Sequence, residues 1–218
     1  MASETESAAT RAYTHIRDGI IEGRYETGTM LGEAGLAAEL SVSRTPIRAA
    51  LVRLQEEQWI TIYPRRGALV RGLSERELTD LADARYVLES AAIQRADAPQ
   101  ITRLAGRLTE QIAEQQAAFE AEDIARFVEL TTAFHRSFVE VGGNGVLLEL
   151  SDRLADRQRY MLFKIGPTLL QRCESILEEH RQLVAALGDV DSARFSATLR
   201  GHINDVHTER LAALSPLD

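Results

Sequence analysis

The chain has 218 residues, a formal net charge of −8 at pH 7 and a single cysteine, Cys173. This length allows one large domain or two small ones. One cysteine excludes an intramolecular disulfide framework and fits a reducing compartment. The sequence shows neither an apolar run long enough to span a membrane nor a signal peptide at its polar start. We therefore expect a cytoplasmic protein with no membrane contact.

The first predicted element is an amphipathic helix that ends at Gly23. Its apolar residues share one face at helical spacing, and they are Tyr13, Ile16, Ile20 and Ile21. We expect this helix to pack behind the segment that follows it.

The segment 35–51 predicts two short helices joined by a tight turn at residues 41–43. We expect Thr45 to be the N-cap of the second helix and Pro46 its first helical residue, because proline needs no amide donor there. An apolar stripe would hold this helix from behind and leave four polar residues facing outward, namely Arg44, Thr45, Arg48 and Arg53. A helix-turn-helix presents such residues to the base edges and phosphates of DNA. A helical hairpin with a charged, solvent-exposed face fits the segment equally well.

Two β-rich runs, 60–63 and 68–71, predict a hairpin directly after these helices. Its turn carries Arg65 and Arg66 beside Gly67, and glycine lets the backbone approach another surface closely. A basic hairpin in this position is typical of a wing that reaches phosphates or the minor groove. The hairpin therefore favours the DNA-binding interpretation of segment 35–51.

The run 41–51 and the Arg-Arg-Gly turn together resemble the winged helix-turn-helix of GntR-type bacterial transcription regulators. The resemblance covers roughly residues 8–72. By this resemblance the operator contacts are Ser43, Arg44, Thr45, Arg48 and Gly67. The predicted DNA-binding set also includes Arg53, Arg65 and Arg66. Many members carry Arg or another polar residue just before the Leu-Ala pair of the first motif helix. This chain has Glu-Ala-Gly at 33–35 instead. We therefore expect one operator contact of some relatives to be missing here.

The charge is divided unevenly along the chain. Residues 1–73 hold nine Arg and nine acidic residues, and within them residues 42–72 hold six Arg and two Glu. Residues 74–218 hold sixteen basic and twenty-four acidic residues, which accounts for the whole −8. Because salt screens charges beyond about 8 Å, the local positive charge governs contact with phosphates. We predict a DNA-binding domain over residues 1–73 and an effector-binding and dimerisation domain over residues 74–218.

The second domain is predicted to be all-helical, and its helices span about 74–96, 99–121, 123–141, 145–165, 168–187 and 191–214. Short connections between such helices favour an antiparallel bundle of six to seven helices. The expected fold is therefore mainly α, with a winged helix-turn-helix (three helices and a two-stranded wing) before the bundle. Arg85 and Glu89, four residues apart near an apolar stripe, are expected to pair with each other or to face a cavity.

Three histidines, His135, His180 and His202, lie on different predicted helices among inward-facing apolar residues. Converging imidazoles could bind a divalent transition metal such as Zn or Ni, although scattered histidines more often make separate hydrogen bonds. This region resembles the FCD effector domain of the FadR subgroup of GntR regulators. Metal-binding members have Asp or Asn four residues before the first histidine, where this chain has Thr131. The resemblance thus implies either a metal with three protein ligands or a polar pocket that has lost its metal.

We expect the effector to be a small organic acid that completes the coordination of the metal, with Arg85, Arg157 and Tyr160 as candidate contacts. The arginines around Arg157 are equally compatible with salt bridges along their own helix. One alternative is a metal-free domain that binds a larger apolar effector against residues 160–163. Another is a metal-dependent enzyme, but the sequence offers no general base beside the metal. We predict a ligand-responsive DNA-binding regulator that is not an enzyme. The resemblance implies that it is a repressor. We expect it to bind a near-palindromic operator as a homodimer.

Overall fold

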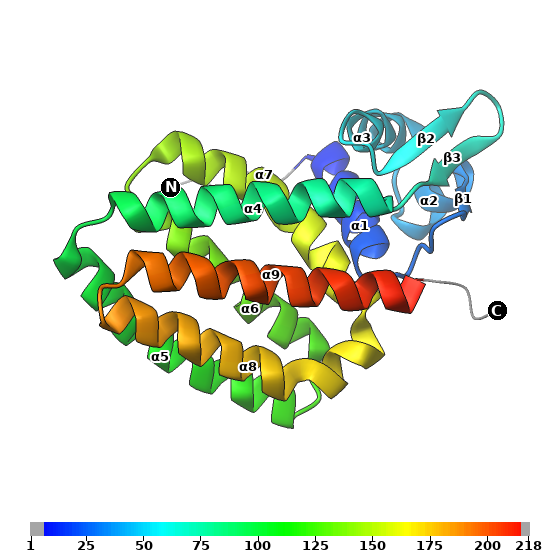
Figure 1. The fold of residues 1–218 in the computed structure, drawn as a ribbon. Coiled ribbons are helices and arrows are strands. Elements are labelled where there is room, and N and C mark those ends of the chain that lie inside the picture. Colours follow the sequence, from blue (N-terminus) through cyan, green and yellow to red (C-terminus); the bar gives the residue numbers. More distant parts are fainter. Residues whose placement is uncertain (1–6, 215–218) are drawn as a thin grey trace. The chain divides into compact units, whose positions relative to one another are not determined.

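The computed structural model describes residues 7–214, with side chains described for residues 7–165 and 169–204. The chain divides between Ser74 and Glu75 into two compact units. The architecture is mainly helical (Figure 1), which confirms the predicted fold class.

Three helices form the body of the first unit, namely α1 (Ala8–Ile21), α2 (Glu33–Glu39) and α3 (Arg44–Glu56). α1 packs against α3, because each helix has an apolar face that is stable only when it is covered. Ile16 of α1 and Ile47 of α3 are completely buried.

α3 begins at Arg44, with Ser43 as its extended N-cap residue. The expectation that Thr45 caps this helix is wrong, because Thr45 already lies in the first helical turn. Pro46 is tolerated in the same turn because its amides have no acceptor within the helix. Arg44 and Arg48 are four residues apart and therefore share one face of α3.

A three-stranded antiparallel sheet completes the first unit. Its strands are β1 (Met30–Leu31), β2 (Ile60–Tyr63) and β3 (Gly67–Val70), in the order β1-β3-β2. β2 and β3 are the two strands predicted for the wing. β1 adds a third strand, which the sequence does not predict because two residues carry no detectable periodicity.

Within the described residues the second unit consists of six helices. They are α4 (Glu75–Arg95), α5 (Ala98–Glu120), α6 (Ile124–Glu140), α7 (Gly145–Lys164), α8 (Gly166–Gly188) and α9 (Ser192–Leu214). Asp97, Asp123 and Asn144 cap α5, α6 and α7 by accepting backbone N–H groups, and such residues mark helix starts in a sequence.

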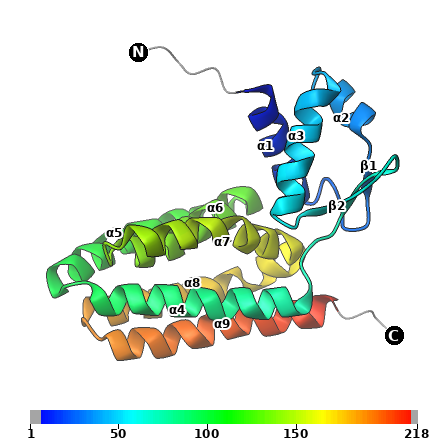
Figure 2. The ribbon, with the colours of Figure 1, turned by 90° about the horizontal axis from the view of Figure 1, so that it is seen from above.

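The helices pack in pairs, α5 on α8, α6 on α7 and α4 on α9. Figures 1 and 2 show α4 and α9 side by side and antiparallel. The core between the helices is apolar and includes the fully buried rings of Phe127, Phe138 and Phe195. It also contains buried polar side chains, among them Arg85, Glu89, Gln115, Thr131, His135, Gln158, His180 and His202. In the described part of the chain, no helix is long and apolar enough to cross a membrane.

Candidate metal centre and DNA-binding surface

A groove of about 620 Å³ lies in the first unit between the start of α2, α3 and the wing. Its charged lining residues are Glu33, Arg44, Arg48, Arg65 and Arg66. Ser43, the N-cap residue of α3, and Thr45, in its first turn, are exposed on either side of Arg44. The structure thus brings together the basic residues of α3 and of the wing, although they lie up to 22 positions apart in the sequence.

Arg53, which the sequence predicts as a DNA contact, does not line this groove. It follows Arg44 by nine residues, which places it about 180° around the helix. Its guanidinium carbon lies 3.6 Å from the centre of the Tyr13 ring, and its Nε donates a 3.0 Å hydrogen bond to Glu57. Arg53 therefore joins α3 to α1.

Gly67, at the wing, has a structural role in addition to any contact with DNA. Its φ of +117° is unfavourable for other residues, and a Cβ atom there would lie 2.5 Å from the carbonyl oxygen of Leu31 in β1. A glycine is therefore needed where the start of β3 lies close to β1.

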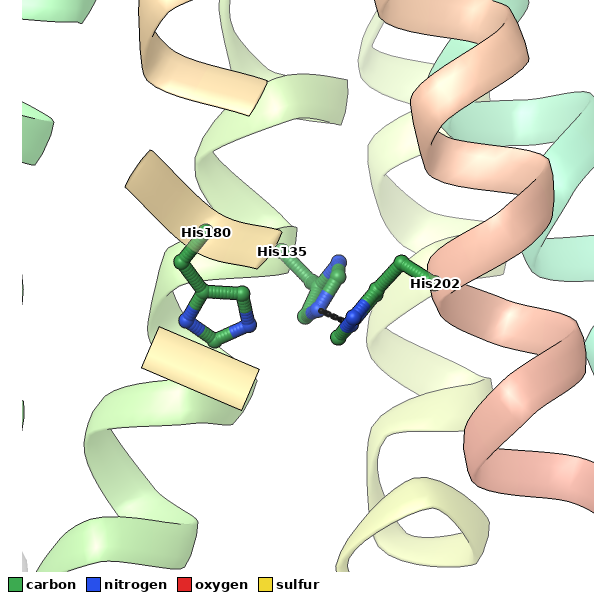
Figure 3. A group of neighbouring side chains, drawn as sticks. All are labelled: His135, His180 and His202. Carbon is green, nitrogen blue, oxygen red and sulfur yellow. Dashed lines mark hydrogen bonds between the residues drawn. The ribbon is translucent and has the colours of Figure 1, made fainter. Parts of the chain in front are cut away.

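The bundle brings three imidazoles together from three helices, His135 on α6, His180 on α8 and His202 on α9 (Figure 3). One nitrogen of each ring lies within 4.8 Å of the other two. The Nε2 atoms of His135 and His202 are 3.1 Å apart. All three rings are buried.

Each of these rings is held by a side chain from another helix. Nδ1 of His135 lies 2.7 Å from Glu89 Oε2, and Nδ1 of His202 lies 2.6 Å from Glu179 Oε2. Nδ1 of His180 lies 2.7 Å from the amide oxygen of Gln115. An acceptor at Nδ1 fixes the proton there, which leaves the lone pair of a neutral imidazole on Nε2.

The electrostatics of the cluster favour neutral imidazoles at His135 and His180. Burial, and secondly the charges of neighbouring Arg85 and His202, lower the pKa of His135 well below its usual value. Burial also lowers the pKa of His180. Burial raises the pKa of Glu89, while its 3.1 Å ion pair with Arg85 acts in the opposite direction and favours the carboxylate. Neutral rings with Nε2 lone pairs turned toward a common point are the form that binds a metal.

Thr131 precedes His135 by one turn of α6 and is buried. Among the described residues its hydroxyl has no hydrogen-bond partner, and the same is true of Nε2 of His180. Two buried polar atoms without partners in one core indicate that something else satisfies them, because such atoms are costly when left alone.

The candidate effector residues are separated in the structure. Arg85 lines a small cavity of about 10 Å³ next to His135, together with Gln158. Within the described residues, Arg85 Nη2 and Gln158 Nε2 are buried without a hydrogen-bond acceptor. Arg157 and Tyr160 do not line this cavity. Tyr160 is buried, and the ε-ammonium of Lys164 lies 5.5 Å from its ring centre.

The sequence interpretation missed four residues of these sites, Glu33, Gln115, Gln158 and Glu179. Gln115 carried a usable signal, because it occupies an apolar position of the stripe that includes Leu108 and Ile112. Glu179 directly precedes His180, and adjacent residues of a helix point to different sides. Glu179 nevertheless belongs to the same cluster, because it contacts the ring of His202 across the α8–α9 interface.

The first unit is a winged helix-turn-helix, and the second is a helical bundle with a buried polar centre. This combination is typical of DNA-binding regulators that have a separate ligand-binding domain. Residues 8–70 match the model for bacterial regulatory proteins of the gntR family, and residues 80–205 match the FCD domain. The chain belongs to the GntR family and carries an FCD domain. It is a ligand-responsive DNA-binding regulator of transcription and not an enzyme.

The chain is similar in sequence to named repressors and in fold to a solved structure. The gluconate operon transcriptional repressor of Bacillus licheniformis is 29% identical over 204 residues, covering 92% of this chain and 84% of the relative. The HTH-type transcriptional repressor RspR of Escherichia coli (strain K12) is 25% identical over 206 residues, covering 93% of this chain and 88% of the relative. A GntR transcriptional regulator from Rhodococcus sp. RHA1 has the same fold, with a TM-score of 0.82 at 23% identity, covering 96% of this chain and 100% of that one.

Proposed function

We propose that the bundle binds a divalent transition metal through His135, His180 and His202, and that a small organic acid bound beside the metal controls operator binding. One observation carries this proposal: every Nδ1 atom of the cluster faces a protein acceptor, while one nitrogen of each ring converges within 4.8 Å. Zinc or nickel suits such a set of neutral imidazoles. When bound, the metal supplies a Lewis acid with open coordination positions.

The charge of the centre supports an anionic effector. Glu89 is paired with Arg85, and Glu179 lies 3.4 Å from Arg172, so each carboxylate that holds a ring has a compensating arginine. Burial favours the neutral form of His135 and of His180, and Thr131 adds no charge. The charge of a divalent metal would therefore be uncompensated in the core, which favours a bound carboxylate.

The donors beside the centre favour an oxygen-rich acid. Nη2 of Arg85 and Nε2 of Gln158 would donate hydrogen bonds to a carboxylate or a hydroxyl group. The relative from Bacillus licheniformis is named for a gluconate operon, and gluconate is a hydroxy acid of this chemistry. A larger apolar effector against residues 160–163 is less well supported, because Met161 and Leu162 are packed into the apolar core.

For the first unit we propose that Ser43, Arg44, Thr45 and Arg48 contact bases and phosphates in the major groove, and that Arg65 and Arg66 contact the DNA backbone. A homodimer would present two such surfaces to a near-palindromic operator. We propose repression as its action, as in the named relatives, and a cytoplasmic location, where operator DNA lies.

Elemental analysis of the full-length chain, purified without added metal, tests the metal proposal. We expect close to one transition metal per chain, and loss of the metal in His180→Ala. Zinc or nickel added after chelation should restore the melting temperature of the parent but not of His180→Ala. A metal-free parent whose melting temperature is unchanged by either ion would contradict the proposal.

A further inference from the structure

One carboxylate lies in a groove that is otherwise basic. Among the charged side chains that line the groove in the described part of the chain, four are arginines and one is Glu33. Glu33 is the first residue of α2, where the positive end of the helix dipole stabilises an acidic side chain. A carboxylate that faces DNA would nevertheless repel phosphates, so its presence in this groove requires an explanation.

Glu33 contacts the central arginine of the recognition helix. Its Oε2 atom accepts a 2.8 Å hydrogen bond from Nε of Arg48. Both side chains line the groove, and the Arg48 side chain is 65% exposed. The pair therefore lies on the surface that faces DNA under the proposed function.

The atoms used in this contact determine which hydrogen-bond donors of Arg48 remain available for DNA. A guanidinium has five N–H donors in a fixed planar fork. When Nε is bound to Glu33, the guanidinium is held along its Nε edge, and the N–H bonds at the far end of the fork, one on each Nη, remain available as a pair of donors. Paired donors of this kind match the O6 and N7 acceptors of guanine in the major groove.

We propose that Glu33 is a positioning residue that determines the base specificity of Arg48. It holds the guanidinium in the orientation that reads a guanine, and its charge opposes a competing contact of Arg48 with a phosphate. The inference rests on the proposed DNA-binding surface and deepens it, because it names the base and the residue that enforces its recognition.

The experiment starts with selection of duplexes from a randomised 20-base-pair library by the full-length chain, followed by sequencing. The preference at each position is then compared between the parent and the variants. Affinities for the selected duplex and for a scrambled duplex are measured by fluorescence anisotropy at several salt concentrations.

Arg48→Ala should lose the preference for guanine at one position of each half-site, with affinity for the selected duplex falling roughly 5- to 150-fold. Glu33→Ala should lose the preference at the same position and bind the scrambled duplex more tightly, with a steeper salt dependence, since Arg48 can then contact a phosphate. Glu33→Gln should keep the guanine preference, because its amide oxygen can accept from Nε. Glu22→Ala, which removes the carboxylate of the exposed Glu22–Arg24 pair outside the groove, should change neither property.

The outcomes separate the inference from the proposed surface. If Arg48→Ala keeps every base preference of the parent, the proposed surface is wrong. If Arg48→Ala loses one preference and Glu33→Ala loses none, only the positioning role of Glu33 is wrong. An equal loss at all positions in Glu33→Ala, with a lower melting temperature, would show a structural role and would also overturn the inference.

Discussion

The amide oxygen of Gln115 lies 2.7 Å from Nδ1 of His180, whereas the other two imidazoles of the cluster each face a carboxylate. A carboxylate raises the basicity of the imidazole it holds more than an amide does. His180 is therefore the one proposed ligand whose Nδ1 partner carries no charge, and substitution of Gln115 can change this.

Gln115→Glu should tighten metal binding roughly tenfold, since partners of metal-bound histidines typically change affinity by 10- to 100-fold. Gln115→Leu should weaken it, because Nδ1 of His180 loses its acceptor. Competition with a chromophoric chelator measures both affinities. The neighbouring Gln116→Glu adds the same charge at a position that contacts Glu120 and Arg181, and it should have little effect.

Thr131 provides a second change at the proposed centre. Thr131→Asp places a carboxylate one turn before His135 on the same helix face and should tighten metal binding. Thr131→Val removes a buried hydroxyl that has no partner among the described residues, so it should stabilise the metal-free chain by about 1 kcal/mol in urea denaturation. If Asp at this position leaves metal affinity unchanged, residue 131 is too far from the metal to bind it.

A matched pair of compounds tests the chemistry of the effector. Gluconate should raise the melting temperature of the nickel-loaded chain and weaken its binding to a selected duplex, whereas sorbitol, which lacks the carboxylate, should do neither. Arg85→Ala is expected to reduce the response to gluconate, because Arg85 lines the cavity beside His135 and its buried Nη2 has no acceptor among the described residues. An equal response to both compounds would exclude recognition of a carboxylate.

The wing depends on one glycine. Gly67→Ala should destabilise the first unit by about 1–3 kcal/mol, because a Cβ atom would meet the carbonyl oxygen of Leu31 at 2.5 Å in a backbone with φ of +117°. Gly35→Ala in α2 is the control. It has no atom within 4 Å of the added Cβ and should stabilise α2 by about 0.5–1 kcal/mol. Both values come from urea denaturation, and equal effects would contradict the packing argument.

The buried histidines predict a pH dependence of stability for the chelated, metal-free chain. The pKa of His180 is lowered by burial in the folded chain, while in the unfolded chain it is about 6.5. Below pH 6.5 the unfolded chain therefore binds more protons, and the free energy of unfolding falls by about 1.4 kcal/mol per pH unit for each such group. The ring centres of His180 and Phe134 are 4.3 Å apart, and the ring of His180→Phe can keep this stacking. In this variant the slope of the free energy of unfolding against pH should decrease by the contribution of about one proton. An unchanged slope between pH 5 and 6.5 would show that His180 does not titrate in this way.

The sequence by itself determined the elements and the nature of the two halves. Amphipathic periodicity, caps such as Asp97 and breaks such as residues 142–144 act locally, so they fix helix boundaries without reference to the rest of the chain. The motif of residues 41–51 is equally local, and it indicates a DNA-binding helix without any knowledge of the fold.

Only the tertiary structure decided which side chains meet. The pairs Glu89–His135, Gln115–His180 and Glu179–His202 join different helices, and a helical pattern states which face is buried but not what it contacts. The same limit applies to Arg53, whose charge predicted a DNA contact but whose ring contact with Tyr13 depends on how α1 packs on α3. Local interactions along the chain set the helices, whereas distances between side chains remote in sequence are set by the packing of those helices.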